Sequence, residues 1–116
     1  MSRKDWRVEE QSAVLQDYIA ISEHIERWTE DRALADRTVD AIRTFVKSLA
    51  TAPHRGTRRD DLRPGLRIVP FGKRTAIAFE ITEDAGIVTI LRVFHGGQDY
   101  ETVMRGARAS EIACFG

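Results

Sequence analysis

Residues 66–94 read LRIVPFGKRTAIAFEITEDAGIVTILRVF, and a hydrophobic period of two in this stretch decides the fold. Residues 75–82 alternate between large apolar side chains and small or polar ones, which predicts a strand with one face on a core. The large apolar side chains are Ile77, Phe79 and Ile81. Residues 87–94 are apolar on both faces, as in a central strand that is covered on both sides. Residues 66–69 add a third strand.

Short turns separate these three strands. Gly72 and Lys73 follow the first strand, and the second turn, residues 83–86, ends on Gly86, which is free to adopt a positive φ. Pro70 limits pairing at the end of the first strand because proline has no N–H to donate. Strands joined by turns this tight run antiparallel, so we expect a meander.

Upstream of the meander the hydrophobic period is helical. Apolar residues recur at spacings of three and four at Val14, Tyr18, Ile21, Ile25 and Trp28, and the stripe is widened by Leu15, Ile19 and Ser22. A second stripe comprises Ala35, Thr38, Val39, Ile42, Val46 and Leu49. We predict two helices with Ser12 and Asp31 as N-caps, the second ending near Ala52 because Pro53 follows. The short link between them favours an antiparallel hairpin.

The remaining segments complete the expected architecture. Residues 6–9 alternate and predict a short strand, residues 53–65 lack any period and predict a loop, and residues 101–105 suggest a short helix ended by Gly106. The fold class is therefore α+β: an N-terminal strand and a helix hairpin pack on an antiparallel meander sheet, and the helices lie on one face of that sheet. We expect a single domain followed by a C-terminal tail, residues 1–106 and 107–116.

The composition is that of one globular domain. The chain has 116 residues, of which 42% are hydrophobic and 31% charged, values that fit neither a disordered chain nor a membrane protein. The first residues lack the apolar region of a secretion signal, so we expect a cytoplasmic protein. The single cysteine, Cys114, excludes an internal disulfide, and no base beside it marks it as a nucleophile.

Neither metal nor cofactor motifs stand out. His24, His54 and His95 fall in a predicted helix, a loop and a strand end, without the close spacing of a zinc site. The glycines form neither a phosphate-binding loop nor a dinucleotide fingerprint. We therefore expect no metal and no cofactor.

Positive charge gathers in one segment of a neutral chain. The protein has 18 basic and 18 acidic residues, and residues 1–52 are net acidic. Residues 54–74 carry seven cations against Asp60 and Asp61, a net charge of +5. Such a patch fits an acidic partner or a phosphate. The alternative is a solvated loop without a binding role.

A second group of candidate residues lies at the end of the last predicted strand. The sequence places Arg92 on one strand face with Val88, Ile90 and Phe94. Together with Arg92, the following His95 and Tyr100 can stabilise a phosphate, transfer a proton and stack on a base, which suffices for RNA cleavage without a metal. The alternative is that Arg92 pairs with Asp99 and only holds the C-terminal turn.

Three motifs surround the meander: DLRPGLRI at the first strand, PFGKR at its turn and LRVFHGGQDYE after the last strand. With the helix hairpin upstream, they resemble the ParE/RelE superfamily of toxins from type II toxin–antitoxin pairs over residues 6–105. The resemblance implies a small bacterial toxin of the cytoplasm. It also implies a cognate antitoxin, whose C-terminal segment wraps across the toxin and holds it inactive.

Two activities are implied by the resemblance. RelE-like members cleave mRNA in the ribosome, whereas ParE-like members poison DNA gyrase without being nucleases. We favour a gyrase inhibitor with a ParD-like antitoxin, because the helices lack the dense lysines of ribosome-docking nucleases and residues 1–52 are net acidic, a poor surface for RNA. The motif HGGQDYE also looks like the ParE branch, which often has arginine where this chain has Gln98.

The resemblance and the charge pattern together nominate binding residues. For contacts with the target or the antitoxin we expect Arg58, Arg59, Arg63, Arg67, Lys73, Arg74, Arg92 and His95. The favoured hypothesis has no catalytic residue. In the alternative, a ribosome-dependent mRNA endoribonuclease, Arg92 stabilises the scissile phosphate and His95 or Tyr100 moves protons. A third possibility is a decayed toxin that only binds its antitoxin.

Overall fold

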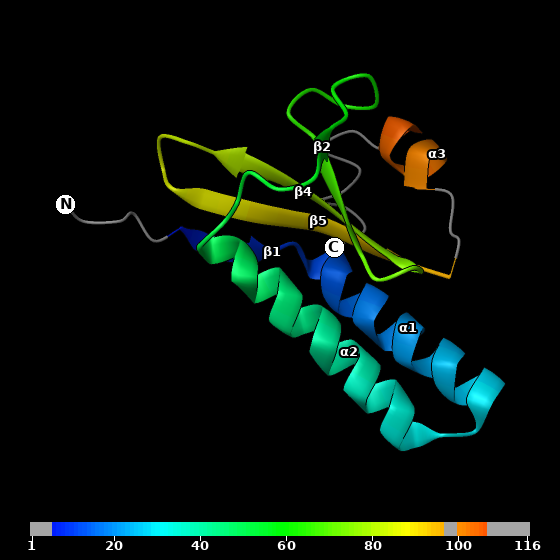
Figure 1. Ribbon diagram of the computed structural model, residues 1–116. Coiled ribbons are helices and arrows are strands. Elements are labelled where there is room, and N and C mark those ends of the chain that lie inside the picture. The colour runs from blue at the N-terminus through cyan, green and yellow to red at the C-terminus, as the bar shows by residue number, and fades with distance from the viewer. Residues whose placement is uncertain (1–5, 97–99, 107–116) are drawn as a thin grey trace.

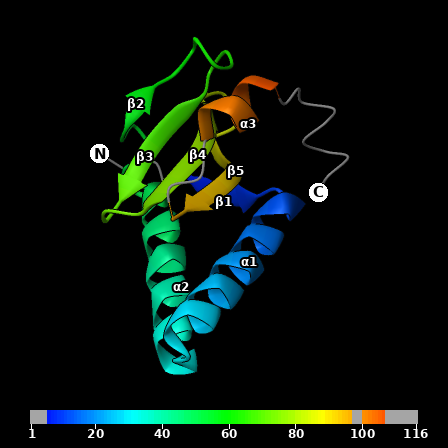
Figure 2. The same ribbon diagram turned by 90° about the vertical axis from the view of Figure 1, so that its right-hand side faces the viewer.

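The computed structural model in Figures 1 and 2 describes residues 6–96 and 100–106. Its helices are α1 (Ser12–Thr29), α2 (Arg32–Lys47), the 3-10 helix η1 (Ser48–Ala50) and α3 (Tyr100–Gly106). Its strands are β1 (Arg7–Glu10), β2 (Thr57–Arg58), β3 (Arg67–Phe71), β4 (Thr75–Thr82) and β5 (Ile87–His95). They form one sheet in the order β1-β5-β4-β3-β2, in which β1 and β5 are parallel and the other neighbours antiparallel. Within the described residues, no helix is both long and apolar enough to cross a bilayer.

The expected α+β architecture is confirmed: a strand and a helix hairpin precede an antiparallel meander. α1 and α2 lie side by side on one face of the sheet, and α3 lies on the opposite face (Figures 1 and 2). The expectation of helices on one face only is therefore wrong. Both faces of the central strand β5 are apolar, so the second face needs a cover of its own. The predicted tail, residues 107–116, lies outside the described residues, as does Cys114.

Two hydrophobic clusters fill the two faces of the sheet. The larger one joins the helix hairpin to the sheet and includes Val14, Tyr18, Ile21, Ile42, Val46, Ile77, Phe79, Val88, Ile90 and Val93. The smaller one, on the α3 side, contains Leu62, Leu66, Ile68, Ala78, Leu91, Phe94 and Met104. Met104 is fully buried, so this one side chain anchors α3 to the sheet.

α1 departs from the predicted stripe at several positions. Ser12 was predicted as the N-cap but is the first helical residue. The N-cap is Gln11, whose side chain makes no capping hydrogen bond. Leu15, Ile19 and Trp28 are 54%, 43% and 74% exposed instead of buried. A helix that packs along one side buries a single arc. Val14 and Tyr18 belong to that arc, and the three exposed residues lie outside it.

α2 begins where the sequence predicts, and its helical continuation stops two residues short of the predicted end near Ala52. The Asp31 carboxylate accepts a hydrogen bond from the Leu34 N–H at 2.9 Å, which confirms the predicted N-cap. The helix ends at Lys47 and passes through η1, which stops before Pro53. Local capping chemistry therefore sets both ends of this helix.

The segment predicted as a loop, residues 53–65, contains the short strand β2. Gly56 precedes β2 with a φ of +78°, and a Cβ atom there would lie 2.4 Å from the Ile68 carbonyl oxygen. Glycine alone permits this close approach of the loop to β3. Pro70 lies in β3 beyond the two residues that pair with β2. Its lack of an N–H therefore costs no hydrogen bond to β2.

Among the described residues, no strand lies beside one end of β5 on the α1 side. β1 pairs with β5 only as far as Ile90, and just beyond it the register between β4 and β5 shifts, so that Leu91 is an extra residue. Because of this bulge, Val88 and Ile90 pack toward the helix hairpin whereas Phe94 packs toward α3. The prediction that Arg92 shares one face with all three residues is therefore wrong.

Asp17 of α1 covers this open edge. Its carboxylate accepts hydrogen bonds from Arg92 Nε at 2.9 Å, from Arg92 Nη2 at 2.8 Å and from the Val93 N–H at 2.9 Å. These bonds raise the pKa of Arg92. The Asp17 side chain is only 10% exposed, so the three bonds replace the water that this carboxylate would otherwise need. The partner of Arg92 is Asp17; the alternative partner, Asp99, lies outside the described residues.

We expect Asp17→Ala to lower the free energy of unfolding by about 3 kcal/mol, because it leaves the Arg92 guanidinium without its counter-ion. Urea unfolding followed by circular dichroism measures the change. Asp36→Ala, at an exposed position of α2, is the matched control and should change stability by less than about 0.5 kcal/mol. Asp17→Ala combined with Arg92→Met should recover part of the loss. Equal stability of Asp17→Ala and the control would contradict the assignment.

Candidate binding site on the open face of the sheet

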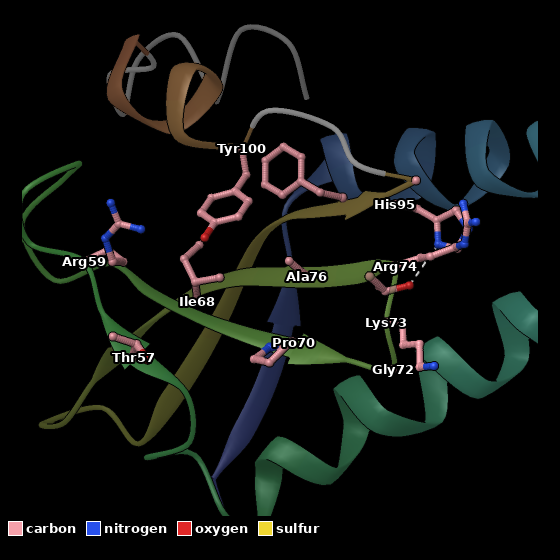
Figure 3. Close-up of a pocket in the computed structure, with 13 residues that line it drawn as sticks. Thr57, Arg59, Ile68, Pro70, Gly72, Lys73, Arg74, Ala76, His95 and Tyr100 are labelled. Carbon is pink, nitrogen blue, oxygen red and sulfur yellow. Dashed lines mark hydrogen bonds between the residues drawn. The ribbon is translucent and has the colours of Figure 1, made fainter.

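A hollow of about 590 Å³ opens beside the turn between β3 and β4 (Figure 3). Its floor consists of apolar side chains of the three meander strands, Ile68, Pro70, Ala76 and Phe94. Its polar lining includes Thr57, Arg59, Lys73, Arg74, Thr75, His95 and Tyr100. We call this site the sheet hollow. It brings together four of the predicted binding residues, from β5 and from the chain between β2 and β4.

Lys73 and Arg74 provide positive charge that the structure leaves unneutralised. They lie exposed in the turn between β3 and β4, where Gly72 has a φ of +68°. Within the described residues, neither side chain has a hydrogen bond or an ion pair. A backbone bond of 2.9 Å from the Gly96 N–H to the Arg74 carbonyl fixes the turn against the end of β5. Both cations are thus available to an external anion on a fixed scaffold.

The other arginines of the basic stretch are engaged inside the protein. Arg59 donates to both carboxylate oxygens of Asp61, at 3.0 and 2.9 Å, and to Glu101 at 3.1 Å. These bonds raise the pKa of Arg59 and lower that of Asp61. Further contacts join Arg58 to Asp60 at 3.3 Å, Arg63 to Glu80 at 3.8 Å and Arg67 Nε to the Arg55 carbonyl at 3.2 Å. Much of the predicted patch is therefore a network that ties the loop to the sheet and to α3.

His95 is half-buried at the end of β5, where it lines the sheet hollow. Its Nδ1 lies 2.9 Å from the Thr75 hydroxyl oxygen. Burial lowers the pKa of the imidazole below its ordinary value, and the nearby His24 and Arg74 lower it further. Since the ordinary pKa of 6.5 is already below 7, a lowered pKa leaves His95 mostly uncharged at neutral pH. Within residues 6–96 and 100–106, no three histidine, cysteine or acidic side chains converge on a point that could hold a metal.

The three residues of the catalytic alternative do not converge. His95 and Tyr100 both line the sheet hollow, and the Tyr100 hydroxyl points into it near Ile68 (Figure 3). Arg92 is not among the residues that line the hollow, and Asp17 binds its guanidinium through two hydrogen bonds. The guanidinium carbon lies 5.5 Å from the centre of the Phe94 ring, which belongs to the floor of the hollow. The strongest predicted phosphate ligand is thus already occupied by a carboxylate of the protein, whereas the two predicted proton carriers line the hollow.

Asp17 is the residue that the sequence analysis missed. It stands beside Tyr18 and between Val14 and Ile21, on the buried arc of α1. A carboxylate on an apolar arc has to find a partner or remain in water. That single feature of the sequence signals a buried ion pair, although the sequence does not show which cation completes it.

Comparison with known proteins assigns the family. The family model described as the ParE toxin of the type II toxin–antitoxin system parDE matches residues 9–100. The chain belongs to the ParE toxin family. The predicted membership in the ParE/RelE superfamily is thereby confirmed, and with it the role of toxin in a type II toxin–antitoxin system. A search of the curated proteins found no match.

Solved structures share the fold of this ParE-family toxin. A chain from the chromosomal ParDE system of P. aeruginosa matches with a TM-score of 0.68 and 20% identity, covering 80% of this chain and 98% of that one. A chain of the RelBE2 toxin–antitoxin complex from Mycobacterium tuberculosis gives 0.61 and 19%, covering 84% and 98%. A mutant of the E. coli toxin RelE in the free state gives 0.58 and 6%, covering 87% and 94%. At such low identities, the similarity shows the fold alone.

We expect His95 to make the ParE-family toxin less stable as the pH falls. Its pKa is lower in the folded state than the ordinary 6.5, so the unfolded chain takes up the proton first and stability is lost as the pH drops below that value. Urea unfolding between about pH 8 and pH 5 should show a smaller acid-side loss for His95→Gln than for the wild type. An NMR titration should place the His95 midpoint below 6.5. A midpoint at or above that value contradicts the prediction.

Proposed function

We propose that this ParE-family toxin acts by binding DNA gyrase and inhibiting it, and that a ParD-like antitoxin neutralises it. The observation that carries the proposal is the ion pair between Arg92 and Asp17, with bonds of 2.9 and 2.8 Å. This pair engages the guanidinium of Arg92, which is not among the residues that line the sheet hollow. The site is therefore better suited to binding a macromolecule than to transferring a phosphoryl group.

The chemistry of RNA cleavage explains why this ion pair matters. Cleavage without a metal needs a cation at the scissile phosphate and proton carriers within hydrogen-bond reach of the same atoms. Releasing Arg92 for that task would leave Asp17 as an unpaired, mostly buried carboxylate, at a cost of about 3 kcal/mol. Because its pKa is lowered, His95 is mostly uncharged at neutral pH and adds little positive charge to the site. The cost of releasing Arg92 and the low positive charge of His95 favour the gyrase hypothesis over the nuclease hypothesis.

The charge distribution also supports a protein target. The strand β1 and both helices of the hairpin belong to the net acidic residues 1–52, which would be repelled by ribosomal RNA. The unpaired cations, Lys73 and Arg74, lie in the turn between β3 and β4. A small basic patch on a neutral protein increases the rate of encounter with an acidic protein surface.

The solved relatives support the antitoxin as a second partner. The similar chains from P. aeruginosa and Mycobacterium tuberculosis come from a ParDE system and from a RelBE2 toxin–antitoxin complex. We place this toxin and its antitoxin in the bacterial cytoplasm, where gyrase works. The gyrase-inhibiting activity would then be present only while the antitoxin is absent.

We expect the purified toxin to inhibit DNA supercoiling by purified gyrase, and premixing with the co-encoded antitoxin to restore supercoiling. Agarose gel electrophoresis of a relaxed plasmid measures both effects. Toxin unfolded by heat and left aggregated is the control for nonspecific inhibition. Normal supercoiling at a large excess of folded toxin would refute the gyrase hypothesis.

The endoribonuclease hypothesis has one observation in its favour, because His95 and Tyr100 line the same hollow as the unpaired Arg74. If it holds, the toxin cuts mRNA in a translating ribosome extract, and both His95→Gln and Tyr100→Phe abolish the cuts. Primer extension on the mRNA detects them. The gyrase hypothesis expects uncut mRNA in all three samples.

A further inference from the structure

A second hollow, of about 410 Å³, lies between α2 and the turn that joins β3 to β4. We call it the α2 hollow. It is lined from α2 by Arg37, Thr38, Ala41 and Ile42, and from the strand ends by Phe71, Gly72, Lys73, Arg74, Thr75 and His95. Ile42 and Phe71 belong to the hydrophobic cluster on the hairpin face of the sheet. Its volume lies in the range of sites for small molecules.

Three cations from two distant segments line the α2 hollow. Arg37 comes from α2, whereas Lys73 and Arg74 come from the turn. All three are exposed, and within the described residues none of them has a hydrogen bond or an ion pair. Lys73 extends toward α2 and Arg74 toward His95 (Figure 3). Like charges around one concave space repel each other, so a bound anion would stabilise this arrangement.

The acidic residues of α2 limit the size of that anion. Asp36 and Asp40 flank Arg37 along the chain and are exposed, and residues 1–52 are net acidic. A nucleic-acid strand bound at Arg37 would pass these carboxylates, which repel its phosphates. A compact anion meets only the cations of the hollow. The charge pattern therefore favours a small ligand over a nucleic acid.

The number of cations favours phosphate groups over a carboxylate. A carboxylate carries one negative charge, whereas a diphosphate concentrates several negative charges on neighbouring oxygens. Arginine binds phosphate through two parallel hydrogen bonds, and lysine adds a mobile point charge. Arg37, Lys73 and Arg74 together supply two such guanidinium groups and one ammonium group. A diphosphate or triphosphate group matches this set.

An apolar wall next to the cations can hold a nucleoside. Ala41, Ile42 and Phe71 form this wall. The Phe71 ring is half-buried and stacks on Phe45, with ring centres 4.8 Å apart and an angle of 25° between the planes. The stacking fixes the ring before any ligand binds. A base or a ribose can pack on such a wall while its phosphates contact the cations.

We propose that the α2 hollow binds a ligand with a diphosphate or triphosphate group through Arg37, Lys73 and Arg74, with a nucleoside on the apolar wall. Such a ligand would occupy Lys73 and Arg74, the two cations that attract the target under the proposed function. It would therefore compete with gyrase for the toxin. Only this regulatory consequence rests on the proposed function.

The first test compares ligands in titration calorimetry. The purified toxin should bind ADP more tightly than pyrophosphate, and inorganic phosphate at least about tenfold more weakly than pyrophosphate, because a single phosphate reaches fewer cations. Pyrophosphate that binds as tightly as ADP would overturn the role of the apolar wall. Absence of ADP binding, or phosphate that binds as tightly as pyrophosphate, would overturn the site itself. So would a single-stranded oligonucleotide that displaces ADP at an equal concentration of phosphate groups.

The second test changes α2 alone. Arg37→Glu should weaken ADP binding at least about tenfold, whereas Arg32→Glu, an equal change of charge at an exposed position outside the hollow, should retain the affinity. Ala41→Trp should block the hollow without changing its charge, and Ala33→Trp on the same helix is its control. Thermal unfolding verifies that all four variants fold. Full affinity of folded Arg37→Glu or Ala41→Trp, or an equal loss in its control, contradicts the proposal.

Nuclear magnetic resonance distinguishes the two hollows, which share the turn. Addition of ADP should shift the backbone amide signals of residues 37–42 and 71–75. Thr57 and Tyr100 line the sheet hollow but not the α2 hollow, so their signals should stay in place. Shifts at Thr57 and Tyr100 without shifts in α2 would assign the ligand to the sheet hollow and overturn the proposal.

Gyrase binding separates the regulatory consequence from the proposed function. Interferometry measures the affinity of the toxin for immobilised gyrase, without ATP and at constant ionic strength. Saturating pyrophosphate should weaken binding of the wild type but not of Arg37→Glu, which has lost the ligand site. Equal weakening of both proteins would overturn competition at this site. If the wild type does not bind gyrase at all, the proposed function fails, and calorimetry still decides whether the α2 hollow binds the ligand.

Discussion

The structure depends on which groups form hydrogen bonds with the backbone at the end of β5 that β1 does not reach. β1 is too short to cover β5 beyond Ile90, and exposed edge groups in a packed layer must find partners. The Asp17 carboxylate is such a partner: it accepts one hydrogen bond from the Val93 N–H and two from the Arg92 side chain. One carboxylate thus fixes the position of α1 on the sheet and also the orientation of Arg92. The same contact engages the charge of Arg92 within the protein.

The basic stretch shows that the number of cations in a sequence can exceed the number that remain free to bind a partner. Arg59 and its two acidic partners join the loop before β3 to α3. Exposed pairs of this kind add little to stability, but they remove positive charge from the surface. Lys73 and Arg74 are not part of this network, because they lie in the tight turn between β3 and β4 and not in the loop before β3. Within the described residues, three of the seven cations have acidic partners, and of the other four only Lys73 and Arg74 are exposed.

Local patterns explain why much of the fold could be predicted. The strands β3, β4 and β5 follow from a period of two with turn residues between them, and the start of α2 follows from Asp31. Contacts between distant segments escaped prediction. Leu15, Ile19 and Trp28 fit the helical spacing but are exposed, because the neighbours that α1 meets decide which arc is buried.

The sequence by itself determined the order and type of the elements other than β2 and η1, the family and the presence of a basic stretch before the meander, since these depend on local periodicity, capping and motif. Only the tertiary structure decided that β1 lies parallel to β5, that α3 covers the second face and that Asp17 pairs with Arg92. The pairing joins residues on α1 and β5, and a bulge at Leu91 sets its geometry. Which of two acids an arginine reaches depends on how a helix docks on a sheet edge, and spacing along the chain does not encode that distance.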